Sequence, residues 1–359
     1  MNRVLNVAIT GYYGTGSSAV IDLLREYEFV KVEPFELPYE HVVFYRHNGL
    51  FDLYNLLLHG NTIYSSDKVI SSFLKEMEKL NKYDYGWYGS YKKLVGDKFM
   101  DLIYEFVEAI SEKKSYKSSN HVIKTRFSLI KALAQLAFRI VKGRKFSSYG
   151  RKYIYDNEEA FISLPTEVEI SQAAKKLTNG YFSMFSNNDN VKIKIFDHLI
   201  WPSQIDTFAK CFDDNFKVIV VERDPRDLFI LDKYIWYRVK GKNGESNFSE
   251  DVNKYIAQWK RFFVTNYESK HVLRVKFEEL VYNYSDSVYR IERFLGLDSK
   301  EHIKKRQFFN PNISIENTQV FSVCDEWNNE IEVIEKELSG FIYDFPYKRT
   351  PIKNKMMDI

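Results

Sequence analysis

The stretch Val4-Leu5-Asn6-Val7-Ala8-Ile9-Thr10-Gly11-Tyr12-Tyr13-Gly14-Thr15-Gly16-Ser17-Ser18 decides the fold class. Residues 4–9 are mostly apolar and partly β-branched, as expected of a buried strand in a parallel sheet. Residues 17–27 carry apolar side chains at helical spacing, and residues 29–32 have the pattern of a second strand. The stretch therefore predicts a β-loop-α-β unit, which is nearly always right-handed.

The glycine-rich loop of this unit has the spacing Gly11-x-x-x-x-Gly16-Ser17-Ser18. Glycines let backbone N–H groups close around phosphate oxygens, and the start of a helix favours negative charge. The spacing is that of a P-loop, but Ser17 stands where a lysine is expected. We predict phosphate binding. A P-loop kinase or NTPase stays an alternative, which the missing lysine disfavours because that cation normally contacts the β- and γ-phosphates.

A second pattern overlaps the same loop. Gly14-x-Gly16-x-x-Ala19, with Glu33 about 20 residues further on, also fits the dinucleotide fingerprint of a nicotinamide-dependent oxidoreductase. That fingerprint begins directly at the end of the strand, whereas four residues, 10–13, precede Gly14 here. A glycine turn that binds no ligand is the remaining reading.

The second informative motif follows the predicted strand 216–221 and reads Glu222-Arg223-Asp224-Pro225-Arg226-Asp227. In an open parallel sheet, ligands bind in the crevice at the carboxyl ends of the strands, so a cation at this strand end is expected beside the first loop. In the competing interpretation, Arg223, Asp224 and Asp227 form only a surface cap and ion pairs.

Together, the two motifs resemble those of the sulfotransferases that use 3′-phosphoadenosine 5′-phosphosulfate (PAPS). The segments 277–281 (Phe-Glu-Glu-Leu-Val) and 291–297 (Ile-Glu-Arg-Phe-Leu-Gly-Leu) are similar to the family's "E-D-L" turn and its helix ending in "F-L-G-L", and Trp327 is similar to the start of its closing segment. The resemblance covers about residues 4–33 and 191–347. It implies an α/β fold, a three-layer parallel sheet with a P-loop-type phosphate-binding loop.

The resemblance also implies roles for single residues and a reaction that needs no metal. Arg223 would bind the 3′-phosphate of the nucleotide. The residues that would surround the 5′-phosphosulfate are Gly14, Thr15, Gly16, Ser17 and Ser18. Two positions depart from the family: Gly14 replaces a usual Lys or Arg, and Leu231 replaces a frequent Ser. Either another cation, Lys194 or Arg46, fills the gap at Gly14, or the chain is a catalytically inactive relative that binds a glycan or 3′-phosphoadenosine 5′-phosphate (PAP).

Sulfuryl transfer needs a base near the acceptor hydroxyl. His198 follows the predicted strand 191–196 and falls near the place of the family's "T-H-L" base, and its neighbour Asp197 could serve instead. Glu33 and Glu36, just after the second strand, are the alternative carboxylates. A lone histidine can also simply cap a helix or pack under a loop.

Residues 40–190 match no pattern of the family, and helical periodicity dominates there, for example at 69–80, 99–110 and 129–141. We predict a helical insertion that carries acceptor specificity, within a single α/β domain that spans residues 1–359.

Charge is unevenly distributed along the chain. Residues 113–152 hold twelve Lys/Arg and no Asp/Glu, although the formal net charge of the whole chain is only +3. Such a segment can contact an anionic membrane or an anionic acceptor, or it can be a core-packed helix with a solvated basic face. No nucleic-acid-binding motif is present, so we do not expect nucleic acid as a partner.

The expected function is transfer of a sulfuryl group from PAPS to a hydroxyl of a glycan or glycolipid. The N-terminal apolar run is too short for a signal-peptide core, and no stretch approaches the ~18 apolar residues of a membrane span. Two cysteines without a motif fit a reducing compartment. We therefore expect a cytoplasmic protein, with membrane association through residues 113–152 as one option.

Overall fold

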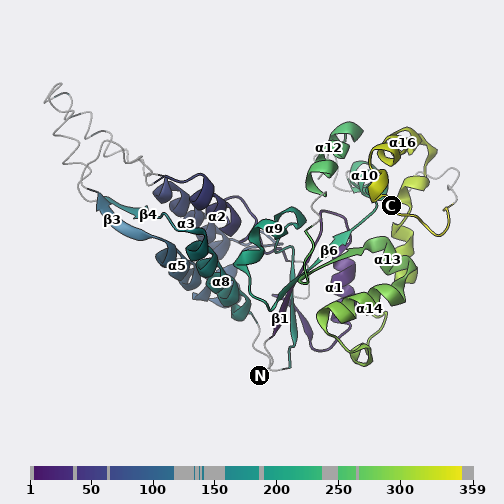
Figure 1. Cartoon of the computed structure of the whole chain (residues 1–359), viewed down its shortest axis with the longest axis horizontal. Helices are drawn as coiled ribbons and strands as arrows, with labels where there is room; N and C mark the ends of the chain where they lie inside the picture. Colours follow the sequence, from purple (N-terminus) through teal and green to yellow (C-terminus); the bar gives the residue numbers. More distant parts are fainter. Residues whose placement is uncertain are drawn as a thin grey trace. The chain divides into compact units, whose positions relative to one another are not determined.

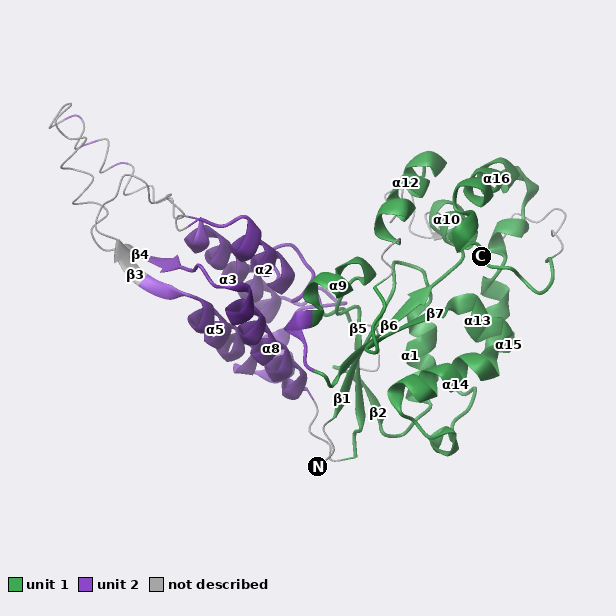
Figure 2. Ribbon diagram, in the orientation of Figure 1, with its two compact units in different colours: residues 1–41, 186–209, 214–359 green, residues 42–185, 210–213 purple. Residues whose placement is uncertain are grey.

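The computed structural model describes two compact units of the chain, which Figures 1 and 2 show. Unit 1 consists of residues 1–41, 186–209 and 214–359, and unit 2 of residues 42–185 and 210–213. The described residues are 4–34, 39–62, 65–116, 133, 137, 140, 158–185, 190–236, 250–263 and 267–349.

Unit 1 is built on a five-stranded parallel sheet with the strand order β2-β5-β1-β6-β7. The strands are β1 (Leu5–Thr10), β2 (Val30–Glu33), β5 (Ile193–Asp197), β6 (Phe216–Glu222) and β7 (Val272–Lys276). The central strand β1 pairs with β5 on one side and β6 on the other, so all five carboxyl ends meet at one edge. The prediction of an α/β fold with a parallel sheet is confirmed.

Both faces of this sheet are buried. On one face, Val7, Ile9 and Val221 pack in a core with α1 (Ser17–Arg25), α13 (Phe277–Tyr282) and α14 (Tyr284–Leu295). Ala8, Phe196 and Val220 alternate onto the other face and are also buried. Each fully buried aliphatic or aromatic side chain stabilises the fold by about 1.5–3 kcal/mol. Burial on both faces explains the continuous apolar runs of these strands.

The other helices of unit 1 follow the sheet strands in sequence. They are α9 (Ile205–Phe208), α10 (Pro225–Ile230), α12 (Val252–Phe262), α15 (Pro311–Ser314) and α16 (Asn328–Glu337), with a π-helix at Leu231–Trp236 and 3₁₀ turns at Pro202–Gln204, Ala209–Cys211, Ser299–Glu301, Ile315–Asn317, Val320–Ser322, Asp325–Trp327 and Ser339–Phe341. A second apolar core joins α10, α12 and α16. α9 is a single α-helical turn between the 3₁₀ turns Pro202–Gln204 and Ala209–Cys211. The helix predicted to end at Gly296 does end there, with Gly296 at φ 74°.

Unit 2 is mainly helical. Its elements are α2 (Leu50–His59), α3 (Ser66–Lys82), α4 (Tyr91–Val95), α5 (Lys98–Ile110), α8 (Glu167–Met184) and the antiparallel pair β3 (Glu112–Tyr116) and β4 (Glu158–Ile162). The helices predicted at 69–80 and 99–110 lie within α3 and α5. The helix predicted at 129–141 lies almost wholly outside the described residues.

The strand pair of unit 2 was not among the elements expected from the sequence, in which helical periodicity dominates residues 40–190. β3 reads Glu-Lys-Lys-Ser-Tyr and has no apolar alternation, so no pattern indicated a strand. The organisation as one domain with an insertion stays a prediction. No helix in the described part of the chain has the length and apolarity needed to cross a membrane.

Candidate functional site

The glycine-rich loop directly after β1 is compact. Thr15 folds back, and both its N–H and its hydroxyl donate to the carbonyl oxygen of Tyr12, at 3.1 and 2.9 Å. Gly16 has φ 95°, and a Cβ there would lie 2.7 Å from Cδ2 of Phe277. A Cβ on Gly11 would lie 2.0 Å from Oγ1 of Thr15. Glycine is therefore required at both ends of the loop.

The loop leads into the N-terminus of α1 at Ser17. The N-cap residue is Gly16, no side chain caps the helix, and its first turn holds no acidic residue. The first N–H groups of a helix have no intrahelical acceptor, and the helix dipole adds partial positive charge there. Ser17 is half-buried and Ser18 is exposed. The loop and helix start thus form a cradle that suits an anion.

Arg223 is the cation of this site. It follows β6 and is 7% exposed, and its Nη1 donates to the carbonyl oxygen of Gly14 at 2.9 Å. Its Nη2 donates to the carbonyl of Asn317, and its Cζ lies 4.9 Å from the ring centroid of Phe277. Its Nε is buried without a hydrogen-bond partner among the described residues. The structure therefore brings the two sequence motifs together and leaves one guanidinium donor unsatisfied.

The two aspartates of the second motif are buried, so they do not form the surface cap of the competing interpretation. Asp224 is 1% and Asp227 is 0% exposed. The Asp224 carboxylate accepts the backbone N–H of Arg226 and pairs with the Arg226 side chain through both oxygens. Asp227 accepts hydrogen bonds from the backbone N–H groups of Gln319 and Phe321. Burial raises the pKa of Asp227 to about 6, although the charge of Arg223 lowers it. Arg223 is the residue of this motif that donates a hydrogen bond to the loop.

His198 and Asp197 lie at the end of β5, the strand next to β1. His198 has φ 45°, and its backbone N–H donates to the carbonyl oxygen of Ile9 at 3.0 Å, which anchors it beside the start of the loop. Its Nδ1 is 2.7 Å from Oδ1 of Asp197, without the direction of a hydrogen bond, so this is a close electrostatic contact. Burial lowers the pKa of His198, but the charges of Asp197 and Glu40 outweigh burial and raise it.

Aromatic rings connect His198 to the loop, a feature that the sequence patterns did not reveal. The ring of Trp201 stands edge-on to His198 at 5.8 Å between centroids. It stacks on Tyr12 at 5.9 Å and meets Tyr13 edge-on at 5.6 Å. Tyr13 is 43% exposed, so part of this aromatic surface is open.

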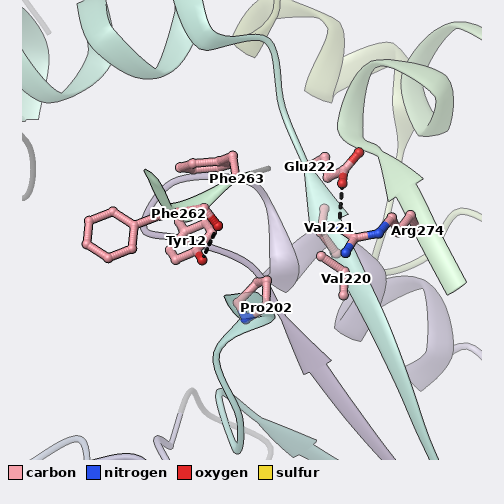
Figure 3. Close-up of a pocket in the computed structure, with 8 residues that line it drawn as sticks. All are labelled: Tyr12, Pro202, Val220, Val221, Glu222, Phe262, Phe263 and Arg274. Atoms are coloured by element: carbon pink, nitrogen blue, oxygen red, sulfur yellow. Dashed lines mark hydrogen bonds and ion pairs between the residues drawn. The ribbon is translucent and has the colours of Figure 1, made fainter. Parts of the chain in front are cut away.

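Tyr12 also lines a small pocket, which Figure 3 shows. The Tyr12 hydroxyl donates to the carbonyl of Phe262 at 2.7 Å, and Arg274 pairs with Glu222 at 2.8 Å. The lining residues are Tyr12, Pro202, Val220, Val221, Glu222, Phe262, Phe263 and Arg274. The pocket thus combines aromatic faces with one ion pair.

The carboxylate alternatives lie farther from the loop. Glu33 ends β2, which β5 separates from β1, and its side chain is buried 3.8 Å from Lys31. Burial raises the pKa of Glu33, and Lys31 and Lys194 partly oppose this. Glu36 lies outside the described residues. His198 and Asp197, at the end of the strand next to β1, therefore lie nearer to the loop than Glu33 does.

Lys194, one of the two proposed substitutes for a loop cation, does not reach the loop. Lys194 pairs in register with Asn6, four residues before the end of β1. Four strand residues span about 13 Å, which is more than a lysine side chain reaches. Arg46 belongs to unit 2, where it pairs with Glu76 at 3.3 Å. Within unit 1, Arg223 is the predicted site cation that contacts the loop.

Two further expectations concern metal ions and the basic segment 113–152. Among those residues, no group of three or more His, Cys, Asp or Glu is arranged to hold a metal ion. The basic segment 113–152 lies almost entirely outside them, so its predicted membrane or acceptor contact stays a prediction.

The fold and site define an α/β protein with a P-loop-type anion-binding loop. The profile of the family described as the sulfotransferase domain matches residues 101–342, about two thirds of the chain, and the chain belongs to that family. The match includes Arg223 and the segment 277–281 but begins after the glycine-rich loop. The predicted family membership is confirmed.

Solved structures with similarity to the chain include three sulfotransferases. The sulfotransferase domain of the Synechococcus PCC 7002 olefin synthase is 12% identical, with a TM-score of 0.38 and 96% of each chain covered. The sulfotransferase domain from the curacin biosynthetic pathway is 12% identical, with a TM-score of 0.36 and 96% and 99% covered. A Mycobacterium avium sulfotransferase is 13% identical, with a TM-score of 0.37 and 98% and 79% covered. At these TM-scores the likenesses carry no argument. No curated protein matches the sequence.

Proposed function

We propose that the chain transfers a sulfuryl group from PAPS to a hydroxyl of a glycan or glycolipid. The observation that carries this proposal is the contact of Arg223 with Gly14 at the uncapped start of α1. PAPS has anionic groups at its 5′ and 3′ ends. A helix start and a buried guanidinium, side by side at one sheet edge, offer two anion sites for one nucleotide.

The donor would lie across these two sites. Backbone N–H groups at the end of the loop would bind the 5′ end, with the hydroxyls of Ser17 and Ser18 nearby. The unsatisfied Nε of Arg223 would donate to the 3′-phosphate as a charge-assisted hydrogen bond. Residues of the 5′ site are Gly14, Thr15, Gly16, Ser17 and Ser18.

His198 is the proposed base. When bound, PAPS would supply an activated sulfur and PAP as the leaving group. His198 would take the proton of the acceptor hydroxyl while the hydroxyl oxygen bonds to sulfur and the bond from sulfur to the phosphate oxygen breaks. Asp197 stabilises the imidazolium that forms, because its carboxylate lies 2.7 Å from Nδ1. Nε2 is then the nitrogen that receives the proton.

The aromatic surface supports a saccharide acceptor. Trp201 contacts both His198 and Tyr13 of the loop, and flat aromatic rings pack well against the apolar face of a sugar ring. The acceptor would reach sulfur over these rings. Residues 40–190 and the basic segment 113–152 stay proposals for acceptor specificity and for contact with an anionic membrane or acceptor.

Gly14 favours one alternative, a family member that binds PAP but is catalytically inactive. A cation at this position would stabilise the leaving phosphate, and in the described part of unit 1 the helix start and Arg223 provide the positive charge near it. A P-loop kinase or NTPase is less well supported, because Ser17 replaces the lysine such enzymes use.

Calorimetric titration tests these alternatives. We expect the purified chain to bind PAP without a metal, and Arg223→Ala to weaken this binding. The matched control is Arg293→Ala, an exposed arginine on α14, which should bind PAP as the wild type does. Binding of ATP only with Mg²⁺, and no binding of PAP, would replace the proposal by the kinase alternative.

An activity assay then separates enzyme from inactive relative. The chain is incubated with PAPS labelled in the sulfuryl group and with a panel of uncharged glycans, glycolipids and simple phenols. Label on a glycan or glycolipid supports the proposal. Tight PAP binding without transfer to any acceptor of the panel supports the inactive relative.

A further inference from the structure

Glu278 is a buried carboxyl whose role the proposed mechanism leaves open. It is the second residue of α13 and is 0% exposed. Its Oε1 accepts the backbone N–H of Asp224 at 2.8 Å. Asp224 directly follows Arg223, so this hydrogen bond holds the peptide unit from which the Arg223 side chain extends.

The side chain of Asp224 cannot replace this support. Its Oδ1 accepts from the backbone and Nε of Arg226, and its Oδ2 accepts from Nη2 of Arg226 and from the backbone N–H of Tyr343. The Asp224 carboxylate therefore holds α10 and the segment at Tyr343. The Asp224 N–H depends on Glu278.

The neighbouring residue on α13 contacts both halves of the donor site. The Phe277 ring lies against Gly16, where a Cβ would come within 2.7 Å of it, and against the guanidinium of Arg223 at 4.9 Å. The start of α13 thus supports the loop through Phe277 and the Arg223 peptide through Glu278.

The surroundings of Glu278 disfavour its charged form. Its Oε2 is buried without a hydrogen-bond partner among the described residues, and an isolated buried carboxylate costs much free energy. Burial and the charges of Asp224 and Asp227 raise the pKa of Glu278 to about 8, although the hydrogen bond from the N–H of Asp224 lowers it. Of the cations nearby, Arg226 is paired with Asp224, and Arg223 points to Gly14 and Asn317. The phenol of Tyr343 is hydrogen-bonded to Glu279, and burial, this hydrogen bond and the charges of Glu279 and Glu278 raise its pKa, so it offers Glu278 no positive charge.

We propose that Glu278 is a positioning residue that works as a neutral carboxyl and fixes the Asp224 peptide so that Arg223 meets the nucleotide. Ionisation of Glu278 places a third negative charge beside Asp224 and Asp227 in a buried space. The segment 223–224 must then shift to let water reach Glu278, and Arg223 loses its position against the loop. This inference rests on the proposed nucleotide site, but it does not depend on the acceptor.

The test measures PAP affinity by calorimetry at pH 7 and pH 9.5 for the full chain, Glu278→Gln and Glu279→Gln. The second ionisation of a phosphate monoester has a pKa of about 6, so the ligand keeps its charge across this range. We expect the wild type to lose about tenfold in affinity at the higher pH. Glu278→Gln imitates the neutral carboxyl and should lose less than about twofold. The control Glu279→Gln changes the partly exposed neighbour and should follow the wild type.

Each outcome has a distinct meaning. A wild type that binds PAP equally at both pH values, or a Glu278→Gln variant that loses as much affinity as the wild type, overturns the inference and leaves the proposed function intact. A wild type that does not bind PAP at pH 7 overturns the proposed function and, with it, the positioning role.

A spectroscopic readout checks the protonation state without nucleotide. The infrared difference spectrum between wild type and Glu278→Gln at pH 7 should contain the carbonyl band of one protonated carboxyl, and this band should vanish at pH 9.5. A carboxylate band at pH 7 in its place overturns the inference even if PAP binds.

Discussion

The carbonyl oxygen of Gly14 accepts a 2.9 Å hydrogen bond from Nη1 of Arg223, which lies 209 residues further along the chain. The contact joins the end of β1 to the end of β6, two strands paired in the centre of the sheet. The two residues therefore form one site because parallel pairing places both strand ends at the same edge.

The first prediction concerns the guanidinium. Arg223→Ala should weaken PAP binding by about 10- to 100-fold, because a hydrogen bond to a charged group contributes about 1.5–3 kcal/mol. Arg223→Lys keeps the charge but loses the planar fork and should also bind more weakly than the wild type. Calorimetry of both variants checks this. Unchanged affinity in Arg223→Ala would show that the arginine only ties Gly14 to Asn317.

The second prediction concerns the loop backbone. Gly16→Ala should lower the free energy of unfolding by about 1–3 kcal/mol, because φ 95° is strained for alanine and the new Cβ meets the Phe277 ring. Gly340→Ala is the control, since a Cβ there meets nothing within 4 Å. Urea unfolding measures both. Equal stability of the two variants would mean that the loop relaxes freely.

Much of the sheet could be predicted from the sequence, because strands buried on both faces need continuous apolar runs. The strand predicted at 216–221 is β6 with one residue more, and the helix expected to end within 291–297 is α14, which ends at Leu295. The polar strand β3 could not be predicted, because its sequence lacks the apolar alternation of a strand. It is a strand because it pairs with β4.

The candidate site was predictable to the extent that its residues lie at strand ends. Arg223 and Gly14 stand in motifs with recognisable spacing. Trp201 stands in no such motif and acts through a ring contact with Tyr12. Glu278 belongs to the segment 277–281 that resembles the family, but that pattern does not indicate its hydrogen bond to a backbone N–H 54 residues away. Such contacts depend on the folded arrangement and leave no local pattern in the sequence.

The third prediction concerns the base. His198→Gln should lower kcat by about 10²–10⁴-fold, the usual contribution of a general base, with PAP affinity nearly unchanged. The activity of the wild type should rise with pH through the pKa of His198, because only the neutral imidazole accepts a proton. Asp197 raises that pKa, so Asp197→Asn should move the rising limb to lower pH. Initial rates across pH 5–9 test both statements, and a limb that stays in place speaks for a different base.

The fourth prediction follows from the linkage of protonation to folding. The pKa of Glu278 is about 8 in the folded chain and near the ordinary value of 4.5 in the unfolded chain. Between these values the folded state binds more protons, so the free energy of unfolding should fall as pH rises from about 4.5 to 8. One proton gives a slope on the order of 1.4 kcal/mol per pH unit. Glu278→Gln should have a flatter profile in urea unfolding over this range, and Glu279→Gln the wild-type profile.

The last prediction concerns the other end of α1. Glu26 and His302 are fully buried, with Oε2 of Glu26 2.5 Å from Nε2 of His302. Oε1 of Glu26 also accepts the backbone N–H groups of Phe308 and Phe309, both at 3.1 Å. Glu26→Ala removes the acceptor of all three donors, leaves the buried donors of His302 and Phe309 without a partner, and should destabilise the fold by about 3–5 kcal/mol.

The matched control for Glu26 is Glu28→Ala. Glu28 is exposed and lies 3.9 Å from Lys304, so its loss should change the free energy of unfolding by less than about 1 kcal/mol. Glu26 lies at the opposite end of α1 from the loop, and nine helical residues span about 14 Å. The folded fraction of Glu26→Ala should therefore bind PAP with nearly wild-type affinity. A large loss of affinity in that fraction would show that the His302 contact also sets the position of the helix start, and with it the anion site.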